Sequence, residues 1–323
     1  MSRLLAAVLF LTATIVFAQP RQPVPSPYAI RDQIANAEDF DLRGLYRALA
    51  LPGEFQEAGE RPNTKLNCMG RACTASVQEM DERAGADRPT HVLSICWSYS
   101  SMCRFVFFHE NRRAKVWSVI RNLDESHNGG MLSPSSGNPF RLGYITTTGT
   151  GAHYSFERWF DVSSSAIVPV HEVLLRGNDA NVQPVRLFQA FLVSEKSTDT
   201  EDILTYVFYV EFESGSFEPM FIDLFDEHRT VRYVRPKGHG RYQFDPARSE
   251  MTAAEMSAYF KVSDAKPFAL DPPPSKLLAF ARKSLRRIAR SGSAAQKEWL
   301  TNYLAAAPAS AIKTELTRAL AAK

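Results

Sequence analysis

The sequence predicts an α+β fold: an antiparallel β-meander, forming a sandwich or an open or half-barrel sheet, with an N-terminal helical brace and a C-terminal helical segment. Two observations support this prediction. Apolar residues recur with a helical period before residue 50, with a period of two from about residue 91 to 244, and with a helical period again afterwards. The 45% hydrophobic fraction is that of a globular chain with enough material for a buried core.

The first eighteen residues have the parts of a secretory signal peptide. Arg3 supplies a positive charge, residues 4–17 form an apolar run, and Ala18 ends a small-residue cleavage site. The run is too short to span a bilayer comfortably, and a proline-rich segment follows it. We therefore expect a secreted or periplasmic protein whose mature chain begins at Gln19.

Residues 19–90 are expected to contain a linker, two helices and a cysteine loop. Ser26 stands before Pro27 at a helix start, because Ser caps a helix N-terminus and Pro fits its first turn. Asp41 caps a second helix with apolar residues at helical spacing, and Pro52 stops it. We expect this pair of helices to pack on the β body as a lid or brace.

A β domain is expected over residues 91–262, including a short closing helix near 253–260. Its connectors are short and polar, whereas a parallel crossover needs a dozen or more residues, so consecutive strands are predicted to be antiparallel. β-Branched and aromatic residues dominate the strands, as is typical of packed pleated surfaces. The expected strands cover residues 92–97, 102–110, 115–121, 141–147, 153–161, 166–175, 184–194, 203–213, 220–225, 230–235 and 241–244.

Two of these strands predict how the sheet is buried. On 203–213 the even-numbered residues are all apolar and the odd-numbered ones are mixed, which predicts one face against a core. Residues 184–193 are apolar on both faces, as in a central strand of a two-layer structure.

A proline-rich linker, 263–274, is expected to isolate a basic C-terminal segment, 275–323, from the β domain. This segment has ten Lys and Arg against two acidic residues, a net charge of +8. Because the whole chain is +3 and Arg3 leaves with the signal, residues 19–274 carry −6. Such asymmetry is typical of a basic tail that meets an anionic partner. The expected helices cover about 276–290, 294–307 and 310–322.

The first C-terminal helix is the candidate binding surface. Its apolar residues lie on one side and cationic residues occupy the rest, as in a helix that docks on an anionic membrane surface or an envelope polymer. The alternative is a solvated basic face on a helix held by its apolar stripe. No specific nucleic-acid partner is expected. The residues expected to contact the anionic partner are Arg282, Lys283, Arg286, Arg287 and Arg290.

The four cysteines form two groups, Cys68 with Cys73 and Cys96 with Cys103, which favours structural disulfides in an oxidising compartment. A hairpin that turns at residues 99–100 places Cys96 opposite Cys103, with Cβ atoms close to disulfide range. Pairings between the two groups stay open. The spacings are not those of a CxxC zinc site, so no metal is expected.

The chain lacks the familiar catalytic motifs, so a non-enzymatic binding or structural role without a cofactor is expected. The His-Glu pair at His171 lacks the second His of a zinc-protease helix. The densest acid–base group is Asp223, Asp226 and His228, and His109 ends a related strand. If those strand ends were neighbours, the group could serve a hydrolase; a solvated turn is the alternative. A further alternative is a carrier of an apolar ligand inside a curved sheet.

Overall fold

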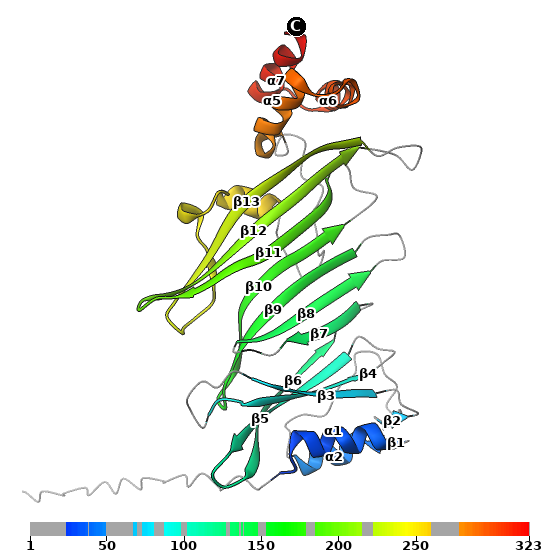
Figure 1. The fold of residues 1–323 in the computed structure, drawn as a ribbon, viewed down its shortest axis with the longest axis vertical. Coiled ribbons are helices and arrows are strands. Elements are labelled where there is room, and N and C mark those ends of the chain that lie inside the picture. Colours follow the sequence, from blue (N-terminus) through cyan, green and yellow to red (C-terminus); the bar gives the residue numbers. More distant parts are fainter. Residues whose placement is uncertain are drawn as a thin grey trace, which may run out of the picture.

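The structure is a computed structural model that describes residues 24–322, except for the positions given at the end of this paragraph. The expected signal peptide, 1–18, and the expected linker, 263–274, lie outside the described residues. The N-terminal helices lie at one end of the long axis and the C-terminal helices at the other (Figure 1). The positions outside the description are 38, 50–66, 70–72, 81–86, 98–101, 127–129, 136, 138, 148–152, 179–184, 215–221 and 260–277.

Two antiparallel sheets with helices at both ends confirm the predicted α+β fold. The strands follow the chain in order across each sheet, so both sheets are meanders. The eight-stranded sheet is open, with β14 and β7 at its edges. It contains β7 (Gly130–Ser135), β8 (Phe140–Thr147), β9 (His153–Val162), β10 (Ile167–Asn178), β11 (Val185–Ser197), β12 (Glu201–Ser214), β13 (Ile222–Pro236) and β14 (Gln243–Phe244).

A four-stranded sheet lies next to the β7 end of the larger sheet (Figure 1). It contains β3 (Cys73–Glu79), β4 (His91–Trp97), β5 (Met102–Asn111) and β6 (Val116–Ser126). A separate short pair consists of β1 (Asp39–Asp41) and β2 (Asn67–Met69).

Helices α1 (Pro27–Asn36) and α2 (Leu42–Ala48) cover one face of the four-stranded sheet, as the expected brace does. Each begins at its predicted cap. Ser26 and Asp41 accept a hydrogen bond from the backbone N–H three residues later, at 3.1 and 2.9 Å. The buried guanidinium of Arg104 on β5 lies 3.8 Å from the Tyr46 ring centroid and ties α2 to the sheet.

The other face of the four-stranded sheet packs against β8 and β9. The stacked rings of Tyr144 and Phe156, 4.6 Å apart, belong to this second core. The molecule is therefore layered at this end, with helices, small sheet and large sheet in succession. The buried members are Met80, Val92, Cys103, Phe105, Phe107, Ile120, Phe140, Leu142, Tyr144, Phe156, Phe160 and Val162.

The large sheet has one covered face around β11 and β12. The predicted apolar face of β12 is confirmed, since its even-numbered residues from Leu204 to Val210 are buried. The predicted burial of both β11 faces is wrong. Phe188 is buried, but Phe191 and Val193 on the other face are 50% and 55% exposed, because no described residue covers that face there.

The expected turn at residues 226–228 is wrong, since these residues lie within the single strand β13. Alternation along the strand exposes Asp226 and His228 and turns Glu227 inward. The charge of the buried Glu227 is balanced by an ion pair with the Arg229 guanidinium, 2.6 Å from its carboxylate. Three consecutive polar residues therefore fit a strand here.

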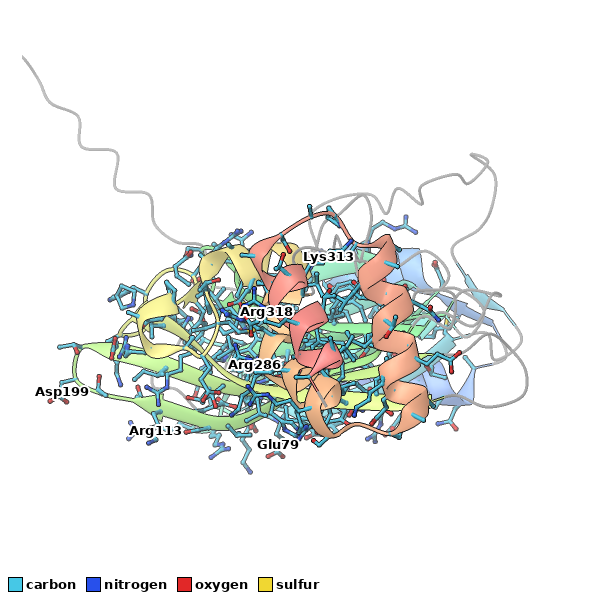
Figure 2. The ribbon with its side chains drawn as sticks, turned by 90° about the horizontal axis from the view of Figure 1, so that it is seen from above. Glu79, Arg113, Asp199, Arg286, Lys313 and Arg318 are labelled. Atoms are coloured by element: carbon cyan, nitrogen blue, oxygen red, sulfur yellow. A yellow bond between two sulfur atoms is a disulfide. The ribbon has the colours of Figure 1, made fainter. Side chains whose placement is uncertain are left out.

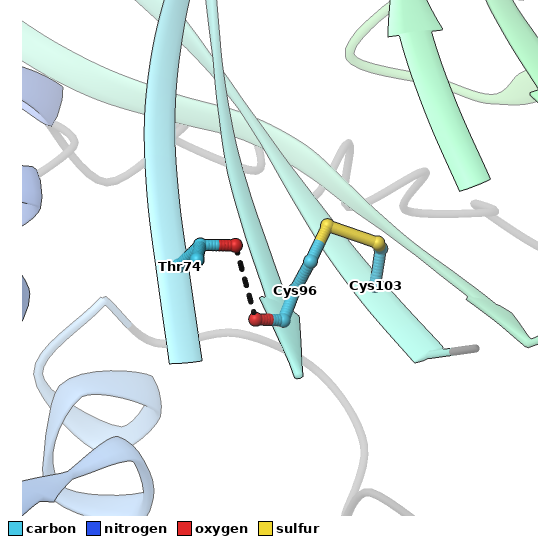
Figure 3. Close-up of a disulfide and its surroundings, with 3 residues drawn as sticks. All are labelled: Thr74, Cys96 and Cys103. Atoms are coloured by element: carbon cyan, nitrogen blue, oxygen red, sulfur yellow. Dashed lines mark hydrogen bonds between the residues drawn. A yellow bond between two sulfur atoms is a disulfide. The ribbon is translucent and has the colours of Figure 1, made fainter. Parts of the chain in front are cut away.

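The Cys96–Cys103 disulfide joins β4 to β5 (Figure 3). The strand register places the two residues directly opposite each other, as predicted, with Cα atoms 4.2 Å apart. That separation is close to the roughly 4.5 Å of a non-hydrogen-bonded antiparallel pair. Cys73 is also disulfide-bonded, whereas the side chain of its expected partner Cys68 lies outside the described ones.

Helices α5 (Arg282–Ser291), α6 (Ala294–Ala306) and α7 (Ala311–Ala321) confirm the three predicted C-terminal helices. They share one core with the large sheet, together with the segment that contains η1 (Pro246–Arg248) and α3 (Ala253–Tyr259). Arg229 on β13 donates to the Phe280 carbonyl at 3.1 Å, and Gln296 on α6 donates to the Leu224 carbonyl at 3.0 Å. The expected isolation of the tail from the β body is therefore wrong.

Candidate functional site

A groove runs between α5 and α7 at the C-terminal end of the molecule. The apolar face of α5 packs into the core through Leu285 and Ile288, and that of α7 packs there through Leu316. The polar faces of the two helices therefore meet. Glu315 joins them. Arg282 Nε donates to one of its carboxylate oxygens at 3.0 Å, and Arg286 Nε donates to the other at 2.7 Å.

The groove has a volume of about 770 Å³ and an excess of positive charge. Hydrogen bonds from Arg282 and then Arg286 hold the pKa of the Glu315 carboxyl below its usual range, so the carboxylate is ionised at neutral pH. Arg290 and Arg318 also line the groove, and neither has an ion-pair partner among the described residues. The lining therefore holds four guanidinium groups and one carboxylate, and Figure 2 shows Arg286 and Arg318 on the helices nearest the viewer.

The groove contains three of the five residues expected to contact an anionic partner. Arg282, Arg286 and Arg290 line it. Lys283 and Arg287 are exposed on α5 but do not belong to the lining. Arg318 and Glu315 were not among the residues expected at this site, because both come from a helix about thirty residues further along the chain.

The residues considered for a hydrolase are divided between the two sheets. His109 lies on β5 and its Nδ1 is 2.9 Å from the Arg88 carbonyl oxygen. Asp226 and His228 form an exposed pair on β13, with 2.8 Å between Oδ2 and Nε2. β5 and β13 lie well apart along the long axis (Figure 1), so His109 does not meet the β13 pair, and the condition set for the hydrolase alternative is not met. The side chain of Asp223 lies outside the described ones.

A second candidate site is the cleft around His171 on β10, at the place where β10 and β11 separate. Among the described residues, these strands pair over residues 176–178 and 187–189. Beyond that point Tyr242, from the segment that follows β13, donates its backbone N–H to the Val170 carbonyl at 2.7 Å. This contact joins the segment after β13 to the separated part of β10. The cleft beside it has a volume of about 520 Å³.

The His171 imidazole is buried among aromatic rings. The ring centroids of Trp159, Tyr206, Tyr233 and Tyr242 lie 4.8–5.7 Å from it, and the Tyr206 hydroxyl is 3.2 Å from its Nε2. Burial, together with the nearby charges of Arg141 and Arg235, lowers the pKa of His171 to about 3. The imidazole is therefore neutral at physiological pH.

The neighbouring Arg235 on β13 links β9 to β12 electrostatically, across the place where β10 and β11 separate. Its side chain is 1% exposed, with Nη1 3.0 Å from Asp161 on β9 and Nε 3.1 Å from Asp202 on β12. Burial opposes ionisation of Asp202, but hydrogen bonds from Ser197 and Gly238 and the Arg235 charge hold its pKa below the usual value. The result is a charge-assisted bridge between strands that are not neighbours in the sheet.

Comparison with protein-family models, with curated proteins and with solved structures gives no match to this chain. Its function therefore has to be inferred from its own residues. Among the described residues, no three His, Cys, Asp or Glu side chains gather as metal ligands. In the same part of the chain, no helix has the length and apolar character needed to cross a bilayer.

Proposed function

We propose that this chain is an exported envelope protein whose β scaffold presents the α5–α7 groove to an anionic partner, an acidic membrane surface or an acidic envelope polymer. The observation that supports the proposal is the groove lining, with four arginines and a single carboxylate. Arginine suits phosphate and carboxylate groups because its planar fork donates two parallel hydrogen bonds. The role proposed is binding, not catalysis.

Two features support export. The first eighteen residues have the composition of a signal peptide, and the Cys96–Cys103 disulfide is compatible with an oxidising compartment.

Arg290 and Arg318 are proposed as the first contacts of the partner. They line the groove without an ion-pair partner among the described residues, so their guanidinium groups can bind an anion without breaking an existing pair. Arg282 and Arg286 differ, because both are engaged by Glu315 and help to hold α5 against α7. Their substitution would combine a binding effect with a packing effect, so they are poor test positions.

The test compares two double variants with the same change in net charge. In Arg290→Glu/Arg318→Glu the groove loses its positive excess, whereas Lys283→Glu/Arg287→Glu changes exposed residues outside the lining. Co-sedimentation with acidic phospholipid vesicles, and with a soluble polyanion, measures binding. We expect the wild type to bind at low salt and to be released at about 1 M salt, where the screening length falls to about 3 Å.

The groove variant should lose binding, and the control variant should keep most of it. The two binding probes distinguish the two kinds of partner. Binding to vesicles alone favours a membrane surface, and binding to the polyanion alone favours a polymer. Equal losses in both variants would show that only overall charge matters and would contradict a defined groove. Failure of the wild type to bind either anion at low salt would overturn the proposal.

A further inference from the structure

The cleft beside His171 has the composition of a small-molecule site and is separate from the α5–α7 groove. It is formed by β9, β10, β13 and the segment after β13 that bonds to Val170. Its volume of about 520 Å³ lies within the range of ligand pockets, roughly 300–1,000 Å³.

One part of the lining is apolar and aromatic. It consists of Phe160, Pro169, Val170, Tyr233 and Tyr242. His171, which also lines the cleft, helps to fix the positions of Tyr233 and Tyr242, because both rings pack edge-on against its buried imidazole. Fixed aromatic rings can bind a flat apolar ligand with little loss of side-chain freedom.

The rest of the lining carries two guanidinium groups. Arg158 is held by Glu172 on the neighbouring strand, with 3.3 Å between its Nε and the carboxylate. Arg241 is exposed and has no ion-pair partner among the described residues. Because the imidazole is neutral, Arg158, Arg241 and Glu172 leave the cleft with one net positive charge.

We propose that this cleft binds a small planar aromatic or conjugated molecule that carries a carboxylate or a similar anionic group. The flat body lies against the tyrosine rings, and Arg241 holds the anionic group. This site differs from a carrier of a purely apolar ligand, because the aromatic core beneath it is filled by packed side chains and the cleft itself is partly charged.

Calorimetric titration with sodium 1-naphthoate tests the proposal, with 1-naphthylmethanol as a neutral probe of the same ring size. The wild type should bind naphthoate more tightly than the alcohol. Arg241→Ala should weaken naphthoate binding at least tenfold, which corresponds to about 1.4 kcal/mol, because the anionic group loses a charged hydrogen-bond donor. The same variant should leave the affinity for the alcohol unchanged, and Arg241→Lys should keep part of the affinity for naphthoate.

Two control variants test whether naphthoate binds in the cleft. Arg287→Ala removes another exposed arginine, outside the cleft, and should bind naphthoate like the wild type. Arg290→Glu/Arg318→Glu should also bind it normally, because the α5–α7 groove is a different site. No naphthoate binding at millimolar concentration, equal binding of the alcohol, or an unchanged affinity in Arg241→Ala would each overturn the proposal. Loss of naphthoate binding in the groove variant would likewise contradict it.

Discussion

Acidification should destabilise this protein through one residue, His171. In the unfolded chain its imidazole has an ordinary pKa near 6.5, whereas in the folded protein burial and the charges of Arg141 and Arg235 lower that pKa to about 3. Between these values the unfolded state binds a proton that the folded state excludes. The stability that His171 contributes is therefore complete above about pH 6.5 and is lost as the pH falls.

The magnitude follows from the two pKa values. At pH 5 the unfolded imidazole is almost fully protonated, and this stabilises the unfolded state by about 2 kcal/mol. The groups that face His171 come from four elements: Trp159 from β9, Tyr206 from β12, Tyr233 from β13 and Tyr242 from the segment after β13. Burial raises the pKa of the Tyr206 and Tyr233 hydroxyls, so neither ionises in this pH range.

Urea unfolding at pH 8 and pH 5, followed by circular dichroism, measures the effect as the change in the free energy of unfolding. His171→Gln removes the titrating group, so this variant should lose about 2 kcal/mol less than the wild type between the two pH values. The comparison uses the change with pH, so a lower starting stability of the variant does not affect it. His228→Gln is the control, because that residue is 59% exposed. Equal pH dependence of wild type and His171→Gln would refute the reasoning.

Three further predictions concern the framework. Arg235→Ala should lower the free energy of unfolding by about 3–5 kcal/mol, because Asp161 and Asp202 lose their buried counter-charge. Arg235→Met should show the same loss of charge pairing with less loss of packing. A urea midpoint close to that of the wild type would contradict this bridge. Replacing both Cys96 and Cys103 by Ala should lower the free energy of unfolding by about 2–3 kcal/mol, because the unfolded chain gains entropy. Peptide mapping of the unreduced protein should recover these two residues linked. Two free thiols at these positions would count against the disulfide. Protein recovered from the producing cell should begin at Gln19 by N-terminal sequencing, and a retained segment 4–17 would contradict export by a cleaved signal.

Local signals in the sequence were sufficient for much of the fold. The caps at Ser26 and Asp41 identified both N-terminal helices, because a cap involves residues only three apart. The Cys96–Cys103 pairing followed from hairpin register in the same way. Strand β7 escaped prediction because it contains Pro134, which is tolerated there since β7 is an edge strand.

The sites depend on contacts between distant parts of the chain. Arg286 and Glu315 are 29 residues apart, and their contact results from the packing of α5 against α7. His171 meets Tyr206 and Tyr242 only because β10 parts from β11 and a later segment packs beside it. Charge composition pointed to the basic helices, but it could not select Arg318 over Arg287 without the tertiary arrangement.

Hydrogen–deuterium exchange of the full mature protein, with and without acidic vesicles, tests most directly whether the α5–α7 groove is where the anionic partner binds. Occupation of the groove predicts slower exchange in α5 and α7, with little change in α6 or in the β11–β12 hairpin, and the change should disappear in Arg290→Glu/Arg318→Glu. Protection located elsewhere in the chain, or vesicle binding without protection of α5 and α7, would contradict the account.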